Sequence, residues 1–304
     1  MPAPLLIAHR GACGYRPEHT RSALLLAIEQ GAEALEVDVV PTADGALVVR
    51  HEPELSGTTD AARRPELADR LRVRVVDGRR RRGWFAEDLT LAEVRTLRAR
   101  ERLPRLRPGS AAHDGREGVL TLGEALGIAR AGGVGLVIEL KHSARSAALG
   151  LPLPALLQEA LAAAPALPPV TVESFEHDVL DALAADGLPH PLVALVGHRP
   201  LRDHALLADP AALARFAGVS LRTHLARPRV VHPLRERGLD VWAWTLRPEN
   251  RFLPPHRRAA GPFGRYAAHW RRLADAGLTG VFADHPDLVR TVLGGARAAV
   301  GGPA

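Results

Sequence analysis

Short apolar strand patterns alternate with amphipathic helix patterns along almost the whole of this 304-residue chain. Such alternation is typical of a mostly parallel sheet that is covered by helices. The expected strands are residues 5–9, 34–39, 46–51, 134–140, 170–175, 192–196, 218–221, 240–246 and 280–284. The expected helices are residues 22–30, 91–99, 122–131, 153–163, 177–185, 228–237 and 265–276.

Nine expected strands are one more than a closed (β/α)₈ barrel holds. The excess falls at Ala43-Asp44-Gly45, a turn too short for a parallel crossover, which predicts a hairpin with one strand antiparallel or outside the barrel. Residues 53–118 are rich in Arg, Pro and Gly, contain one clear helix pattern, and indicate an insertion at the active-site face. The sequence therefore predicts a distorted TIM barrel, an α/β fold of one domain over residues 1–304, with an insertion after the third strand.

The second expected strand carries two carboxylates, Glu36 and Asp38, on one face. Like charges about 4 Å apart repel by about 1 kcal/mol in bulk water and about 4 kcal/mol at an effective dielectric constant near 20. A core strand has no use for such a pair, whereas a divalent cation would turn the repulsion into binding. The alternative is an edge strand whose acidic face lies in water.

Other polar residues also fall where strands end, which is where a barrel forms its site. Glu139 lies in the fourth expected strand and completes, with Glu36 and Asp38, an all-oxygen site suited to Mg²⁺ or Ca²⁺. No Cys or His cluster has zinc spacing. His9 and His51 end the first and third strands and suit acid–base work, because an imidazole titrates near neutral pH.

Two cations complete this set. Arg10 and Lys141 supply the positive charge that a phosphoryl oxyanion requires. Of the 40 basic residues, Lys141 is the sole lysine, which hints at a place where a compact ammonium is needed. Together these residues predict metal-assisted cleavage of a phosphodiester.

Taken singly, the same residues allow structural interpretations. Glu139 and Lys141 could form a plain ion pair, and a strand-end histidine could be structural. Asp284 before His285-Pro286 is better read as a cap for the last helix. Trp244 could equally well form part of the cavity wall or core, or contact the substrate. Ser174 could equally well support the local backbone or contact the substrate.

Composition bounds the partners and the compartment. The net charge of +6 is spread along the chain, and the run Arg79–Arg82 is read as a solvated loop, so nucleic acid is not an expected partner. No run of about 18 apolar residues exists, and the first strand pattern begins at Leu5, which leaves no room for a signal peptide. We expect a cytoplasmic protein as the sequence stands, or a secreted or periplasmic one if an upstream signal is missing. Cys13, the single cysteine, leaves the redox compartment open.

The ordered motifs resemble those of the glycerophosphodiester phosphodiesterase family, (β/α)₈ barrels related to phosphatidylinositol-specific phospholipases C, and most closely its periplasmic bacterial branch. The resemblance covers residues 5 to 288. It rests on His9-Arg10-Gly11, Pro17-Glu18-His19-Thr20, Glu36-Val37-Asp38, His51, Glu139-Leu140-Lys141, Ser174-Phe175, Trp244-Thr245 and Gly280-Val281-Phe282-Ala283-Asp284-His285-Pro286.

The resemblance implies hydrolysis of small glycerophosphodiesters to sn-glycerol 3-phosphate and an alcohol. It implies His9 and His51 as the acid–base pair, and one divalent cation, Mg²⁺ or Ca²⁺, on Glu36, Asp38 and Glu139. Arg10 and Lys141 then bind phosphate, and Glu18 and Trp244 join the substrate-binding residues. Two positions depart from the family pattern: Glu52 stands where an Asp is usual and Ala283 where a Thr is usual.

Two other functions stay open. One is cleavage of lysophospholipid or sphingolipid headgroups, with residues 53–118 meeting an anionic membrane surface. The other is a non-catalytic barrel that only binds phosphate esters.

Overall fold

The computed structural model describes residues 3–197 and 200–294 and has a closed parallel barrel at its centre. Eight parallel strands pair in the order β1-β11-β10-β9-β8-β7-β6-β2, and pairing of β1 with β2 closes the ring. The strands are β1 (Leu5–His9), β2 (Ala34–Pro41), β6 (Gly135–Leu140), β7 (Val170–Ser174), β8 (Leu192–Val196), β9 (Gly218–Arg222), β10 (Asp240–Leu246) and β11 (Gly280–Ala283).

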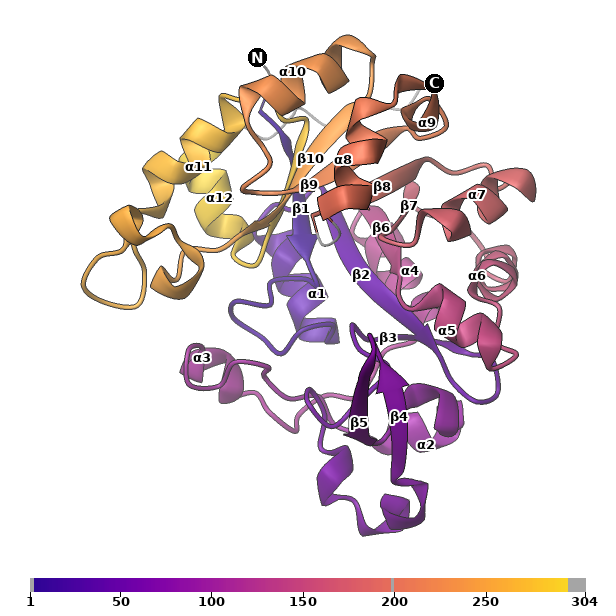
Figure 1. Ribbon diagram of the computed structural model, residues 1–304. Helices are drawn as coiled ribbons and strands as arrows, with labels where there is room; N and C mark the ends of the chain where they lie inside the picture. Colours follow the sequence, from indigo (N-terminus) through magenta and orange to yellow (C-terminus); the bar gives the residue numbers. More distant parts are fainter. Residues whose placement is uncertain (1–2, 198–199, 295–304) are drawn as a thin grey trace.

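Helices cover the outside of the barrel (Figure 1). Thr20 and Thr121 start α1 and α4 by accepting hydrogen bonds from backbone N–H groups of the first turn. The helices are α1 (Arg21–Glu29), α4 (Leu122–Ala131), α5 (Ser143–Ala148), α6 (Leu153–Ala162), α7 (His177–Ala185), α8 (Pro200–Ala208), α9 (Pro210–Leu213), α10 (Pro228–Glu236), α11 (Tyr266–Ala274) and α12 (Pro286–Leu293). The large core lies between these helices and the strands.

The predicted hairpin is confirmed. β3 (Leu47–Val49) pairs antiparallel with the end of β2 and lies outside the closed ring. It is shorter than the expected strand 46–51, and its last residues leave the sheet to carry His51 toward the barrel mouth. The nine predicted strands and the barrel are therefore correct.

Residues 53–118 are more ordered than the sequence suggested. Leu55, Leu89 and Leu97 belong to a second hydrophobic core, which the insertion shares with Val40 of β2 and Val48 of β3. Their elements are β4 (Arg72–Val76), β5 (Arg79–Gly83), α2 (Leu91–Thr96), α3 (Pro108–Ala111) and the short 3₁₀ turns Ala61–Arg63, Pro65–Arg70 and Ala86–Asp88. Two further 3₁₀ turns, Asn250–Phe252 and Pro255–Arg257, lie in the Pro- and Arg-rich segment after β10.

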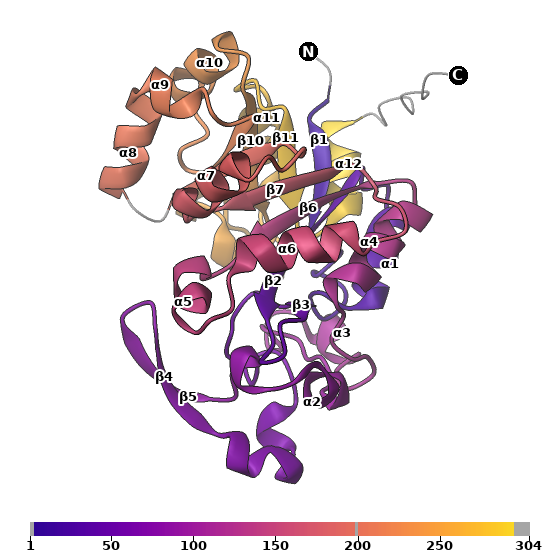
Figure 2. The same cartoon turned by 90° about the vertical axis from the view of Figure 1, so that its right-hand side faces the viewer.

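The loop predicted at Arg79–Arg82 is wrong as secondary structure. These residues form β5, which pairs antiparallel with β4. The hairpin projects from the barrel (Figure 2). The four arginines are exposed, as expected, and the exposure explains the error, because a strand solvated on both faces has no apolar alternation to reveal it.

Within residues 3–197 and 200–294, no helix is long and apolar enough to cross a membrane.

Candidate active site

The interior face of the barrel changes from apolar to polar toward the carboxyl ends of the strands. A small apolar cluster that includes Ile7, Val137 and Phe282 fills the barrel interior. Because strand side chains alternate, the residues two positions further on face the same way. These residues are His9, Glu139 and Asp284, so the strand period itself delivers the polar groups to the mouth.

A cavity of about 340 Å³ opens at this mouth. Seven of the nine predicted site residues line it, together with further aromatic and basic groups. The lining residues are His9, Arg10, Glu36, His51, Glu139, Lys141, Glu173, Phe175, Leu195, Arg222, Thr223, Trp244, Thr245, Arg247, Phe252 and Phe282.

A tight turn after β1 sets the position of Arg10. Arg10 (φ 59°) and Gly11 (φ 76°) both have left-handed backbone conformations, and a Cβ on Gly11 would lie 2.6 Å from the backbone carbon of Ala23. The Arg10 N–H donates to Glu36 Oε2 (2.8 Å), and its Nε lies 3.2 Å from Asp38 Oδ2. The turn thus explains why glycine follows the arginine, and it places a guanidinium beside the acidic cluster.

Glu36, Asp38 and Glu139 come together as predicted. Each offers an oxygen within 4.8 Å of the others, and all three side chains are buried. Burial and the neighbouring Asp38 raise the pKa of Glu36 well above its usual range, and burial raises the pKa of Glu139 to about 8. Burial opposes ionisation of Asp38 as well, but Lys141 and Arg10 hold the pKa of Asp38 well below its usual range.

This donor set fits a hard divalent cation. Its three ligands are carboxylate oxygens, the kind that Mg²⁺ and Ca²⁺ prefer. Glu36 Oε1 is buried and accepts no hydrogen bond from any described residue. A buried, unpaired carboxylate oxygen is costly unless a positive group meets it.

Lys141 reaches the same cluster from the loop after β6. Its Nζ lies 3.1 Å from Asp38 Oδ1 and forms an ion pair with Glu139 Oε1, while 5.5 Å separate it from the centre of the Phe175 ring. The predicted plain ion pair thus exists, but it lies at the cavity rather than on an outer surface. The ammonium is therefore available to a group bound there.

The two predicted catalytic histidines line the cavity, and each is bonded to a different carboxylate. His51 Nδ1 lies 2.6 Å from Glu52 Oε1, and His9 Nδ1 lies 2.7 Å from Asp284 Oδ1. Burial and the nearby Arg10 lower the pKa of His9 to about 4, and burial with Arg10 and Lys141 lowers the pKa of His51 to about 3. Because Nδ1 of each ring is bonded to a carboxylate, Nε2 is the nitrogen left for proton transfer in both histidines.

The helix-cap assignment of Asp284 is wrong. Residue His285, not Asp284, occupies the N-cap position of α12, and no side-chain cap hydrogen bond forms there. Asp284 instead accepts hydrogen bonds from His9, Arg107 and Arg247. The carboxylate points into the barrel because it follows the interior residue Phe282 by two positions.

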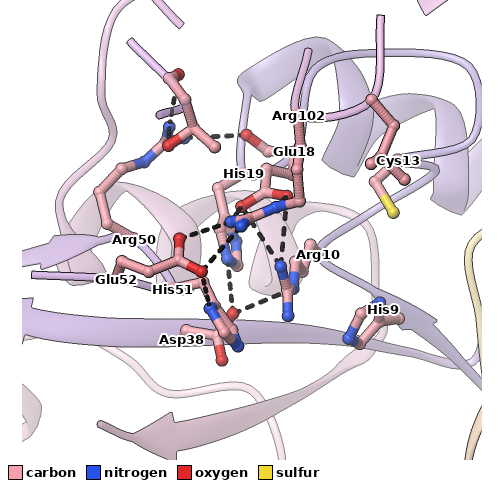
Figure 3. A network of polar contacts seen from close by, with 12 residues as sticks. His9, Arg10, Cys13, Glu18, His19, Asp38, Arg50, His51, Glu52 and Arg102 are labelled. Atoms are coloured by element: carbon pink, nitrogen blue, oxygen red, sulfur yellow. Dashed lines mark hydrogen bonds and ion pairs between the residues drawn. The ribbon is translucent and has the colours of Figure 1, made fainter. Parts of the chain in front are cut away.

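The remaining predicted residues have mixed surroundings. Glu18 lies outside the main cavity, where Arg102 and Arg10 bind its carboxylate (Figure 3). Trp244 lines the cavity and packs edge-on against Phe175, with ring centres 5.4 Å apart. Ser174 accepts from the Glu176 N–H and donates to the Leu140 carbonyl, so it serves as scaffold.

Three further residues that contribute to the site were given no role by the sequence. Glu173, at the end of β7, lines the cavity, and burial raises its pKa well above the usual range. Arg102 and Arg107 reach the site from the insertion. Strand alternation could have found Glu173, but nothing in the sequence separates these two arginines from the other 37.

Comparison with known proteins places the whole barrel in one family. The sequence profile of the glycerophosphoryl diester phosphodiesterase family matches residues 9–288. Glycerophosphodiester phosphodiesterase GDPD6 of Arabidopsis thaliana is 44% identical over 101 residues, which are 33% of this chain and 27% of that protein. The glycerophosphodiester phosphodiesterase of Haemophilus influenzae is 41% identical over 97 residues, which are 32% of this chain and 24% of its own length.

Solved structures share the fold over nearly the full chain. An Oleispira antarctica phosphodiesterase in complex with the product sn-glycerol-3-phosphate superposes with a TM-score of 0.70 at 24% identity, covering 95% of this chain and 96% of that one. A glycerophosphodiester phosphodiesterase from Agrobacterium tumefaciens gives 0.64 at 20% identity, covering 94% and 99%. Since the family profile covers the barrel from its first site residue to its last helix, this chain belongs to the glycerophosphoryl diester phosphodiesterase family.

Proposed function

We propose that this protein hydrolyses glycerophosphodiesters to sn-glycerol 3-phosphate and an alcohol, with the help of one divalent cation. The proposal rests on three sets of groups that meet at one cavity. They are the imidazoles of His9 and His51, each bonded to a carboxylate, the buried carboxylate cluster of Glu36, Asp38 and Glu139, and the cations Arg10 and Lys141, which can bind phosphate. The complex of the Oleispira antarctica relative with sn-glycerol-3-phosphate supports a glycerol phosphate as the product.

Each part of the site has one proposed task. Arg10 and Lys141 bind the phosphoryl oxygens. One of His9 and His51 accepts a proton from the nucleophile, and the other protonates the leaving alkoxide. Glu36, Asp38 and Glu139 would hold Mg²⁺ or Ca²⁺, which when bound supplies Lewis-acid polarisation of a phosphoryl oxygen. Trp244 and Phe175 form a wall for the glycerol, and Glu18 positions Arg10.

A substrate panel tests this proposal. Purified protein is given glycerophosphocholine, glycerophosphoethanolamine and other glycerophosphodiesters with Mg²⁺, Ca²⁺ or chelator, and glycerol 3-phosphate is measured. We expect release with metal and none with chelator. Absence of release from every diester would refute the proposal, and tight binding without release would favour the non-catalytic barrel. We propose a small glycerophosphodiester, and not a nucleic acid, as the partner.

The β4–β5 hairpin favours a second candidate, cleavage of a lysophospholipid or sphingolipid headgroup at an anionic membrane surface. Val73 and Val75 lie on one face of the hairpin and are 51% and 57% exposed, and they pair with the exposed arginines Arg82 and Arg80. Basic groups near an anionic bilayer contribute about 1 kcal/mol each. The hairpin tip reaches the site, because Asp77 contacts His142 next to Lys141.

Vesicle binding separates the two candidates. The lipid candidate predicts that the protein co-sediments with vesicles containing phosphatidylglycerol but not with vesicles of pure phosphatidylcholine. It also predicts that the Val73→Ser, Val75→Ser double variant no longer binds the anionic vesicles. Arg130→Gln, an exposed arginine of α4, is the matched control. If the protein does not bind anionic vesicles at physiological salt, the lipid candidate is refuted, and hydrolysis of soluble glycerophosphodiesters remains as the proposed function.

A further inference from the structure

Each of the two imidazoles is bonded to a carboxylate, and each carboxylate is bonded in turn to an arginine from the insertion. Arg102 binds both oxygens of Glu52, with Nη1···Oε1 2.7 Å and Nη2···Oε2 2.6 Å (Figure 3). Arg107 donates from Nη2 to Asp284 Oδ2. The arginines lie on one short segment, so a single stretch of the insertion reaches both imidazole–carboxylate pairs.

Arg107 is held at several points far apart in the chain. Its side chain is buried, its Nε donates to Glu249 Oε1 (2.7 Å), and its Nη1 donates to the carbonyl of Cys13 (3.1 Å). A guanidinium fixed in this way, together with Arg247, whose Nε donates to the same oxygen at 2.7 Å, defines where the Asp284 carboxylate lies. Asp284 in turn fixes the His9 ring, because its other oxygen accepts from Nδ1.

Arg102 joins the His51 pair to the phosphate-binding arginine. Besides Glu52, it binds both oxygens of Glu18, at 2.7 Å from Nε and 2.7 Å from Nη2. Glu18 lies 3.2 Å from Arg10 Nη1. An isolated ion pair at this partial exposure contributes little, but a fork that meets two carboxylates at once fixes their geometry.

We propose that residues 101–107 form a clamp that positions both catalytic imidazoles, Arg102 acting on His51 through Glu52 and Arg107 acting on His9 through Asp284. Arg102 and Arg107 are positioning residues that do not contact the substrate. The proposal rests on the proposed function, since it takes His9 and His51 as the acid–base pair.

The clamp gives a reason for Glu52 in place of the Asp that is usual in the family. One oxygen of Glu52 bonds to the imidazole of the preceding residue, His51, while both of its oxygens accept hydrogen bonds from Arg102. The extra methylene gives the carboxylate that reach. Glu52 and Arg102 therefore act as a matched pair in this chain.

Steady-state kinetics on the full-length protein test the clamp. We expect Arg102→Gln to lower kcat about 10- to 100-fold with a small change in KM, because orienting partners of this kind typically contribute that much. Arg105→Gln, exposed on the same segment, is the matched control and should leave kcat unchanged. In a double-mutant cycle, adding Arg102→Gln to Glu52→Gln should cost much less than it costs the wild type.

The ring nitrogen spectra of the histidines give a readout that needs no turnover. In ¹⁵N NMR we expect both His9 and His51 to show the single tautomer protonated at Nδ1. Arg102→Gln should release His51 alone into a tautomer mixture, and Arg107→Gln should release His9 alone. Because Arg107 is buried, Arg107→Gln is first checked for a thermal transition like that of the wild type. If Arg107→Gln does not fold, the test rests on Arg102→Gln.

The outcomes are distinguishable from failure of the proposed function. If the wild type releases no glycerol 3-phosphate, the function fails while the tautomer test of the clamp still stands. If both variants keep wild-type tautomers, or if the losses in the cycle are additive, the clamp is refuted whatever the activity.

Discussion

His9 and Asp284 lie 275 residues apart in the chain and are joined by a hydrogen bond of 2.7 Å between Nδ1 and Oδ1. The contact links the first strand of the barrel to the residue after the last one, so it exists only when the ring is closed. Burial opposes ionisation of Asp284, but Arg247, Arg107 and His9 hold its pKa well below the usual range. The carboxylate is therefore an acceptor that keeps the His9 proton on Nδ1.

Asp284→Asn should lower kcat by about 10²- to 10⁴-fold, because the amide can donate to Nδ1 and stabilise the wrong tautomer. The measurement is glycerol 3-phosphate release at saturating substrate. Asp287→Asn, whose side chain accepts hydrogen bonds from the Tyr15 hydroxyl, is the control and should keep wild-type kcat. A near-normal Asp284→Asn enzyme would remove the orienting role.

His51→Ala and Glu36→Ala should both lose activity, but for different reasons. The first removes an acid–base group, typically a loss of about 10²- to 10⁴-fold, and should leave metal affinity intact. The second removes a metal ligand and should weaken metal binding as well. Calorimetric titration with Ca²⁺ or Mg²⁺ separates them, and equal metal affinity in the two variants would contradict the assignment.

Lys141→Arg should not preserve function, although the charge is kept. The ammonium lies 3.1 Å from Asp38 and contacts Glu139 in a buried position, where a planar guanidinium needs more room. We expect kcat/KM to fall about tenfold or more. A wild-type kcat/KM in this variant would contradict the prediction that position 141 needs a compact ammonium group.

Metal binding should strengthen as pH rises from 6 to 8.5. Burial raises the pKa of Glu139 to about 8, so a proton competes with the cation below that pH. Without metal, this raised pKa contributes stability that is present below the ordinary value near 4.5 and lost as pH rises through 8. The rise in Tm on adding Ca²⁺ or Mg²⁺ should therefore be larger at pH 8.5 than at pH 6, and equal rises at both would argue against Glu139 as a ligand.

The fold was largely predictable because short, mostly apolar strand patterns alternate with amphipathic helix patterns along the chain, and side chains within a strand alternate with a period of two. The same period places Glu36, Asp38 and Glu139 on interior faces, so the acidic cluster also followed from sequence. It also places Asp284 two residues after the interior Phe282, at the end of the expected strand 280–284, but the helix that follows favoured the wrong role for it, a helix cap.

The contribution of the insertion could not be predicted. Arg102 and Arg107 look like any of the other arginines, and only the folded chain shows which carboxylates they meet. The β4–β5 hairpin was missed because four successive arginines carry no apolar signal, and its pairing is held by backbone hydrogen bonds rather than a core face.

The insertion leaves the barrel and returns to it at one place. Val48 forms a bridge with Thr121, and the Val49 N–H donates to the Leu120 carbonyl at 2.8 Å, just before and just after the excursion. The eight parallel strands pair with one another and with no residue of 53–118, so the closed ring does not depend on strand pairing with the insertion. Arg102 and Arg107, by contrast, reach the two imidazole–carboxylate pairs from within the insertion. A proteolytic cut within residues 53–118 should therefore leave the strand pairing of the barrel intact while it disturbs the positions of both imidazoles.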